Sequence, residues 1–382
     1  MNFALPYIYY YFSVFLGIFS SQMGRDFKKI TKLLFIFVTI YFIGLRGFVE
    51  ADWLIYYPVW KIAPSLFEGS DAVFKFLSNT FYEKGFAFLL VICKTLCNNY
   101  IFLQFVILLF TLFCLNSFLT RYCNKYYYLG ACLFYLFGGY MLSIIMIRNC
   151  ISVMFFILSI PSLIERNWKK YFLQNFIGLL FHSSSFFYFP LYFFLHIRYK
   201  NFLIIPVWLI GNAIFLLQIP LAMKLFSSVS GVLFGAYGHL VTNYLTSKQY
   251  ATSYGISIGF IERTLTFLLF FSKRKSFYNK EALVFLNMFY LYSFVFLFFS
   301  DFRIVVDRIP ILIYCCYWFL YPKFYGFLTK RTKVIFLLIL LMYSLIKIVM
   351  FFGTPIGLYE NVVTGAMSYE NRKEFTMREV KP

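Results

Sequence analysis

The chain has 382 residues, of which 62% are hydrophobic and 13% are charged. Apolar side chains, above all 55 Phe and 33 Tyr, exceed what a soluble domain can bury, which excludes a cytoplasmic globular enzyme and favours a lipid-facing surface. The formal net charge of +20 does not indicate a nucleic-acid partner, because the basic residues punctuate apolar runs instead of forming a solvated cationic face.

Basic residues between the apolar runs indicate which connections face the cytoplasm. The first run, residues 5–21, has no Lys or Arg before it and no small-residue cleavage site after it, so we expect a retained helix and no removed signal peptide. Arg25, Lys28, Lys29 and Lys32 follow, which places this loop inside and the N-terminus outside. Later clusters that we assign to the cytoplasmic side are 121–125, 166–170, 198–200, 273–280 and 323–333.

These sides and run lengths predict an all-α, polytopic membrane bundle with about 12 transmembrane helices and one re-entrant or interfacial helix. We expect a single domain over 1–382 with outer loops at 46–84 and 220–255 and an outer tail at 353–382. The expected spans are 5–21, 31–46, 100–120, 127–147, 149–165, 168–182, 184–198, 201–219, 256–272, 281–300, 309–322 and 334–352.

Two segments leave alternatives open. If the basic clusters on both sides of 171–195 lie inside, this segment crosses twice and turns near 182–185; the alternative is one helix of 25 residues with one cluster outside. Only one crossing fits between Lys84 and Arg121, so the short run 86–93, which is followed by Lys94, is assigned to the re-entrant or interfacial helix.

The sequence carries no cofactor signature. The eight Cys lack the spacing of a zinc site or a disulfide scaffold and are interpreted as small apolar helix residues. There is no glycine-rich phosphate loop, no paired-His metal helix and no nucleophile elbow. We therefore expect neither a metal nor a cofactor, and a transferase would draw its donor from the membrane.

Under this topology the chemically interesting polar residues fall on the outer face. Guanidinium groups at a membrane boundary suit the diphosphate of a lipid carrier, because the planar fork donates bidentate hydrogen bonds to phosphate oxygens. The outer residues are Arg46, Glu50, Asp52, Tyr56, Tyr57, Glu83, Arg148, His182, Asp301, Arg303, Asp307, Arg308 and 359–361.

Each of these signals also has a purely structural explanation. Arg46 sits where a helix ends, so it can snorkel or pair with Asp52, and Glu83 can be a solvated helix start. His182 can be held by hydrogen bonds alone. The adjacent Glu262 and Arg263 can pair within an apolar helix, and the Tyr and Phe content is mostly lipid-facing packing and interfacial belts.

Five short motifs, in order, resemble the EpsG family, relatives of the O-antigen polymerase Wzy. The likeness covers about residues 30–195, and Arg308 before an apolar helix extends it. The matching segments are Gly44-Leu45-Arg46-Gly47-Phe48, Asp52-Trp53 with Tyr56-Tyr57, Tyr82-Glu83-Lys84-Gly85-Phe86, Met146-Ile147-Arg148-Asn149 and Phe181-His182-Ser183-Ser184. Ala51, Asn149 and Ser185 stand where the family pattern has Gly, Gln and Ala.

The resemblance implies a metal-independent polysaccharide polymerase (O-antigen, capsule or exopolysaccharide) of the bacterial plasma membrane. It would join undecaprenyl-diphosphate-linked oligosaccharide repeat units on the periplasmic or extracellular face. The implied partners are that lipid-linked donor, the bilayer, and a chain-length regulator and flippase of the same pathway.

Such a reaction needs positive charge where the diphosphate leaves and a proton acceptor for the attacking hydroxyl. We predict diphosphate binding by Arg46, Arg148, Arg303 and Arg308. The candidates for the base are Asp52, His182 and Glu83, and those for sugar binding are Trp53, Tyr56 and Tyr57. The alternatives are a lipid-linked oligosaccharide flippase, which should carry charges along a path facing both sides, an O-antigen ligase or other membrane glycosyltransferase, an acyltransferase, or a scaffold.

Overall fold

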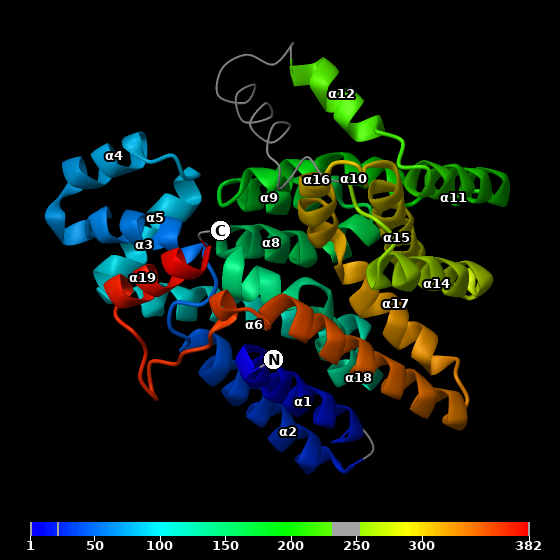
Figure 1. The fold of residues 1–382 in the computed structure, drawn as a ribbon, viewed down its shortest axis with the longest axis horizontal. Coiled ribbons are helices and arrows are strands. Elements are labelled where there is room, and N and C mark those ends of the chain that lie inside the picture. The colour runs from blue at the N-terminus through cyan, green and yellow to red at the C-terminus, as the bar shows by residue number, and fades with distance from the viewer. Residues whose placement is uncertain (1, 21–22, 231–252, 381–382) are drawn as a thin grey trace. The chain divides into compact units, whose positions relative to one another are not determined.

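The computed structural model describes residues 2–20, 23–230 and 253–380, and most of the expected loop 220–255 lies outside this description. Helices joined by short connections make up the described chain (Figure 1). The β-pairings recorded there are two isolated bridges, both at Asn361. The prediction of an all-α membrane bundle is confirmed.

The chain divides into two compact units, and each is described by itself. The first unit contains Met1–Tyr192 and Tyr321–Pro382, and the second contains Phe193–Leu320. Whether the whole chain acts as one membrane domain stays a prediction.

The first unit contains most of the long helices together with a group of short ones. Asn99 and Asn167 stand at the starts of two of its helices, where each side chain accepts a hydrogen bond from a backbone N–H of the first turn. The helices are α1 (Leu5–Ser20), α2 (Arg25–Thr39), α3 (Trp53–Ile62), α4 (Ser70–Asn79), α5 (Lys84–Leu96), α6 (Tyr100–Tyr122), α7 (Tyr127–Phe134), α8 (Ile147–Ile164), α9 (Trp168–Leu179), α10 (Tyr188–Phe194), α18 (Lys330–Phe352) and α19 (Tyr369–Val380).

Stacked aromatic rings hold the centre of the first unit together. The rings of Tyr7 and Phe352 stack with centroids 3.6 Å apart, and those of Phe42 and Tyr359 stack at 4.3 Å. These pairs join the N-terminal helices to the C-terminal part of the chain, and each such pair adds stabilisation beyond the area it buries. Much of the aromatic content is therefore core as well as lipid-facing surface.

Three π-helical segments interrupt the long helices of the first unit: Ile40–Gly44, Tyr135–Gly139 and Met141–Ile145. Gly138 has φ +99°, a left-handed conformation that glycine adopts without a steric cost. Such breaks expose backbone carbonyls that a regular helix would use internally, and they are frequent at functional sites.

The segment 171–195 forms a hairpin. Helix α9 ends at Leu179, and Tyr171 near its start donates a hydrogen bond of 2.6 Å to the carbonyl of Tyr188 in α10. Tyr171 also contacts the ring of Tyr192. One continuous helix is excluded, so the expected turn is confirmed; whether both arms cross the membrane stays a prediction.

The number of spans is not confirmed. In the described residues four helices are long and apolar enough to cross a membrane, or six if each of two bent pairs forms one span. Helix α9 has 12 residues, or about 18 Å, against a hydrocarbon core of about 30 Å. Helix α5 has 13 residues, which agrees with a short helix in the region assigned as re-entrant or interfacial.

The second unit packs its helices through parallel rings. Trp208 stacks on Phe267 with centroids 4.6 Å apart, and Phe215 stacks on Phe260 at 4.3 Å. Arg263 lies 3.9 Å from the ring centroid of Phe296 and bonds to a tyrosine hydroxyl. The elements are α11 (Asn201–Leu216), α12 (Leu221–Ser230), α14 (Ile258–Ser272), α15 (Lys280–Phe298), α16 (Arg303–Arg308), the 3₁₀ turn Pro310–Ile313 and the first half of α17 (Cys315–Gly326).

Candidate functional site

An ion pair joins two distant parts of the first unit. Arg148 Nη1 donates to Glu83 Oε2 at 2.7 Å, and the two side chains are only 20% and 22% exposed. Arg148 is the second residue of α8, where the positive end of the helix dipole disfavours a cation. An anion must therefore compensate this guanidinium, and Glu83 supplies one.

Aromatic rings surround the Arg148 guanidinium. Its carbon lies 4.4 Å from the ring centroid of Tyr82 and 5.8 Å from that of Tyr56. Burial raises the pKa of the Tyr82 phenol, the positive charge of Arg148 opposes this, and the carboxylate of Asp52 adds to it. The Nε of Arg148 is buried and has no hydrogen-bond partner within the described chain, so part of this cation's donor capacity is unused.

The turn at His182 docks against the same ion pair. The backbone N–H of Ser183 donates to Glu83 Oε1 at 2.9 Å, so both carboxylate oxygens of Glu83 accept a hydrogen bond. Ser184 donates to the amide oxygen of Asn149 and its N–H donates to His182 Nδ1 at 3.1 Å. Glu83, Arg148 and His182 are thereby held in one constellation.

Gly85 permits this close docking. Its backbone N–H donates to the carbonyl of Leu180 at 2.8 Å. A Cβ at position 85 would lie 2.7 Å from that oxygen, closer than real Cβ atoms approach backbone. A side chain here would therefore push the start of α5 away from the turn.

Two acidic residues lie ahead of α3. Glu50 has φ +64°, a conformation that costs a non-glycine residue energy and that clusters at functional sites. Burial and, to a smaller extent, the Asp52 carboxylate raise its pKa to about 7, while the charge of Arg372 opposes the increase. Asp52 stands at the N-terminus of α3, so its charge acts on both Glu50 and Tyr82.

Arg46 is buried, with 3% of its surface exposed. Its guanidinium donates to the backbone carbonyls of Ile43 and Ile144, which belong to two of the π-helical segments. Arg46 therefore satisfies acceptors that the irregular helices expose, and a role for it in diphosphate binding stays a prediction.

The remaining predicted arginines belong to the second unit. Arg303 pairs with Asp307 one turn further along α16, at 3.4 Å, and is 51% exposed; Arg308 is also exposed. Asp301 accepts the backbone N–H groups of Ala222 and Met223 and so fixes the start of α12. Diphosphate binding by Arg303 and Arg308 stays a prediction.

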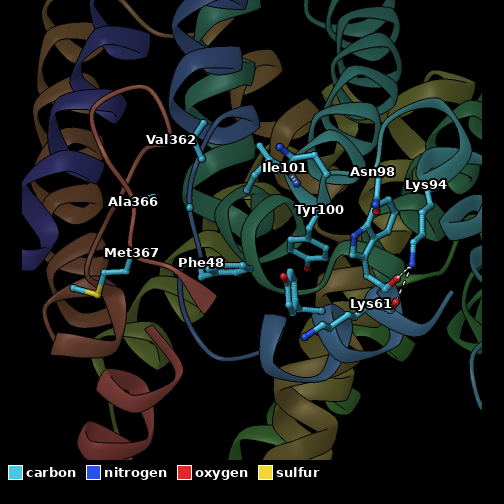
Figure 2. Close-up of a pocket in the computed structure, with 13 residues that line it drawn as sticks. Phe48, Lys61, Lys94, Asn98, Tyr100, Ile101, Val362, Ala366 and Met367 are labelled. Atoms are coloured by element: carbon cyan, nitrogen blue, oxygen red, sulfur yellow. Dashed lines mark hydrogen bonds between the residues drawn. The ribbon is translucent and has the colours of Figure 1, made fainter. Parts of the chain in front are cut away.

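A cavity of about 540 Å³ lies in the first unit, beside α3 and the start of α6 (Figure 2). Of the three residues predicted to bind sugar, Tyr57 lines it. Trp53 is buried, with its Nε1 donating to the Glu50 carbonyl, and Tyr56 packs toward Arg148. The lining residues are Gly47, Phe48, Tyr57, Trp60, Lys61, Lys94, Asn98, Asn99, Tyr100, Ile101, Val362, Ala366 and Met367.

The sequence analysis assigned no site role to Arg372. This residue of α19 is fully buried and donates to the carbonyls of Ile356 and Leu358, while its Nε and Nη1 have no partner among the described residues. The sequence around Arg372 is rich in charge and resembles a solvated tail. Its spacing of three residues from Tyr369 places both side chains on one face of a helix, and this is the one sequence signal for burial of Arg372.

Comparison with known proteins identifies one family. The sequence model of the EpsG family matches residues 29–364, which include the Arg148 constellation and all but Ala366 and Met367 of the cavity lining. No curated protein matches the chain, and no solved structure does.

Proposed function

The chain belongs to the EpsG family, and on that premise we propose that it is a polysaccharide polymerase that joins undecaprenyl-diphosphate-linked repeat units. Family membership makes it a membrane protein of the polysaccharide-polymerase type, with a general glycosyltransferase character. The finer proposal is a Wzy-like reaction on the periplasmic or extracellular face of a bacterial inner membrane, building O-antigen, capsule or exopolysaccharide without a metal.

The observation that carries the proposal is the half-buried Arg148 between Glu83 and aromatic rings. Negative charge develops on the diphosphate when the bond from the donor's anomeric carbon breaks. A preorganised guanidinium in a water-poor site stabilises that charge, and the start of α8 adds the positive end of a helix dipole. The unused Nε donor of Arg148 supports this assignment.

The attacking sugar hydroxyl must lose its proton, and we assign Asp52 as the base that accepts it. Glu83 already accepts from Arg148 and from Ser183, which suits a positioning role. His182 Nδ1 lies 3.1 Å from the backbone N of Ser184 and 2.8 Å from its Oγ, which suits a role in holding the turn. Asp52 stands at the N-terminus of α3, where its charge acts on Glu50 and on Tyr82 beside Arg148, which supports its assignment as the base.

Deletion of the gene followed by analysis of lipid-linked glycan tests the proposal. For a polymerase, single repeat units accumulate on the carrier at the outer face. Units trapped inside the cell would indicate a flippase instead, and long chains that remain on the carrier would indicate a ligase. Re-expression of the protein must restore long chains.

A further inference from the structure

The cavity beside α3 combines two kinds of recognition chemistry. Four aromatic residues line it: Phe48, Trp60 and Tyr100, which are at most 9% exposed, and Tyr57. Flat rings with fixed positions stack on the faces of sugars or other rings. Asn98 and Asn99 contribute amides, which both donate and accept hydrogen bonds as sugar hydroxyls require.

The charge of the cavity is of one sign. Lys61 and Lys94 are the charged residues of the described lining, and none of the thirteen lining residues is acidic. Lys94 Nζ donates to the carbonyls of Trp60 and Lys61, at 3.2 and 2.8 Å, which fixes this ammonium group at the cavity wall with a third N–H remaining. The Lys61 side chain is exposed.

Carboxylates close to the cavity have partners of their own. Glu360 Oε2 accepts from the backbone N–H of Met367 at 3.3 Å, and Glu68 accepts from that of Ser65 at 2.7 Å. Burial lowers the pKa of Lys94, and the Glu68 carboxylate has a smaller effect in the opposite direction. The charged side chains that line the cavity itself are therefore the two lysines.

The C-terminal segment forms one wall. In Figure 2, Val362, Ala366 and Met367 stand on one side of the cavity and Lys94 and Asn98 on the other. Gly47 N–H donates to the Glu360 carbonyl at 2.9 Å, and a Cβ on Gly47 would lie 3.0 Å from that of Ala366. Tyr369 stacks on Tyr57 at 4.3 Å. The family match ends at residue 364, so this wall is partly made of residues outside the shared part.

We propose that this cavity binds an acidic sugar of the repeat unit, with its ring against the aromatic side chains and its carboxylate on Lys61 and Lys94. Its size falls in the range of ligand sites, about 300–1,000 Å³. The inference rests on the proposed function for the identity of the substrate, and it makes the C-terminal wall a determinant of which repeat units are accepted.

Calorimetric titration of the full-length protein in nanodiscs tests this inference with a matched pair of probes. Cellobiouronic acid carries one carboxylate, and cellobiose is its neutral counterpart. A hydrogen bond to a charged partner corresponds to about a tenfold change in affinity or more, so the acidic disaccharide should bind about tenfold more tightly. Lys61→Gln and Lys94→Gln should each reduce that preference.

Two further variants separate specific from general effects. Lys75→Gln removes an exposed lysine of α4 that does not line the cavity, and the preference should persist. Ala366→Trp should fill the cavity and weaken both sugars. Equal binding of the two disaccharides, binding of neither, or tighter binding of inorganic pyrophosphate at the same lysines would overturn the inference. Arg148→Ala tests the polymerase proposal separately from the cavity, because its readout is the chain length of the polysaccharide and not the binding of disaccharides.

Discussion

The arginines of the two units are held in different ways. Arg148 pairs with a carboxylate 65 positions away in sequence, at 2.7 Å and with 20% of its side chain exposed. Arg303 pairs within one helix, at 3.4 Å and 51% exposed. Local, exposed pairs contribute little, whereas a half-buried pair fixes geometry and resists screening by salt. The first unit therefore contains the better fixed cation of the two, which suits the diphosphate-binding role that we propose for Arg148.

Replacement of Arg148 should give the largest effect. Arg148→Ala removes the cation at the start of α8, and the loss of one preorganised donor typically costs about 10²- to 10³-fold in rate. Long-chain glycan should disappear from gels of extracted polysaccharide. Arg148→Lys keeps the charge without the planar fork and should recover only part of the activity. The protein must still be found in the membrane fraction; normal chain lengths in Arg148→Ala would refute the assignment.

Glu83→Gln should rank next, because it leaves Arg148 half-buried without its counter-charge. Breaking such a pair costs more than the pair contributes, and we expect about 10- to 100-fold less polymer. Glu165→Gln is the matched control, since it breaks an exposed pair with Arg121 (63% and 47% exposed). An equal loss in both variants would show that the effect is unrelated to the site.

Much of this fold follows from the sequence. The apolar runs and basic clusters predicted the positions of most helices and the turn at 182–185, because hydrophobic length and Lys/Arg bias are local signals. The number of spans does not follow in the same way. Helix α9 is shorter than its apolar run, and Phe137 and Gly138 break the expected span 127–147.

The site was less accessible to sequence reasoning. Arg148 between two apolar runs required a partner, but its pairing with Glu83 depends on the close approach at Gly85, which is a tertiary contact. The hydrogen bonds of Arg46 to the carbonyls of two π-helical segments could not be predicted, because these breaks in the helices have no sequence signal. The cavity joins residues 47–61, 94–101 and 362–367, and no spacing rule connects these.

Arg308→Ala tests whether an exposed arginine of the second unit contributes to polymerisation. If this exposed arginine assists the diphosphate, its removal should lower polymerisation by up to about fivefold, since an exposed ionic contact is worth roughly 1 kcal/mol. The chain-length distributions of Arg308→Ala and Arg148→Ala, measured side by side, show which arginine contributes more to polymerisation. A loss as large as that in Arg148→Ala would move the principal cation to the second unit.

Glu50→Gln should have a smaller effect, which is on the free energy of unfolding and depends on pH. The Glu50 pKa is raised by burial from 4.5 to about 7, so the folded state binds a proton that the unfolded chain has lost. Its stabilising contribution is complete below about pH 4.5 and is lost as pH rises through 7, on the order of 2 kcal/mol.

Thermal unfolding in detergent between pH 5 and 8 checks this dependence. Glu50→Gln should flatten the curve and be the more stable protein at pH 8. Glu370→Gln, at an exposed position of α19, should leave the slope unchanged. An unaltered slope in Glu50→Gln would contradict the assigned titration.

The central claim is that the Arg148 constellation expels a lipid diphosphate while a glycosidic bond forms. Purified protein in proteoliposomes, supplied with synthetic undecaprenyl-diphosphate-linked repeat units, allows both products to be counted. We expect one free lipid diphosphate for each new linkage in the native protein and neither product in Arg148→Ala. Polymer formed at a native rate by Arg148→Ala, or linkages formed without release of lipid diphosphate, would contradict it.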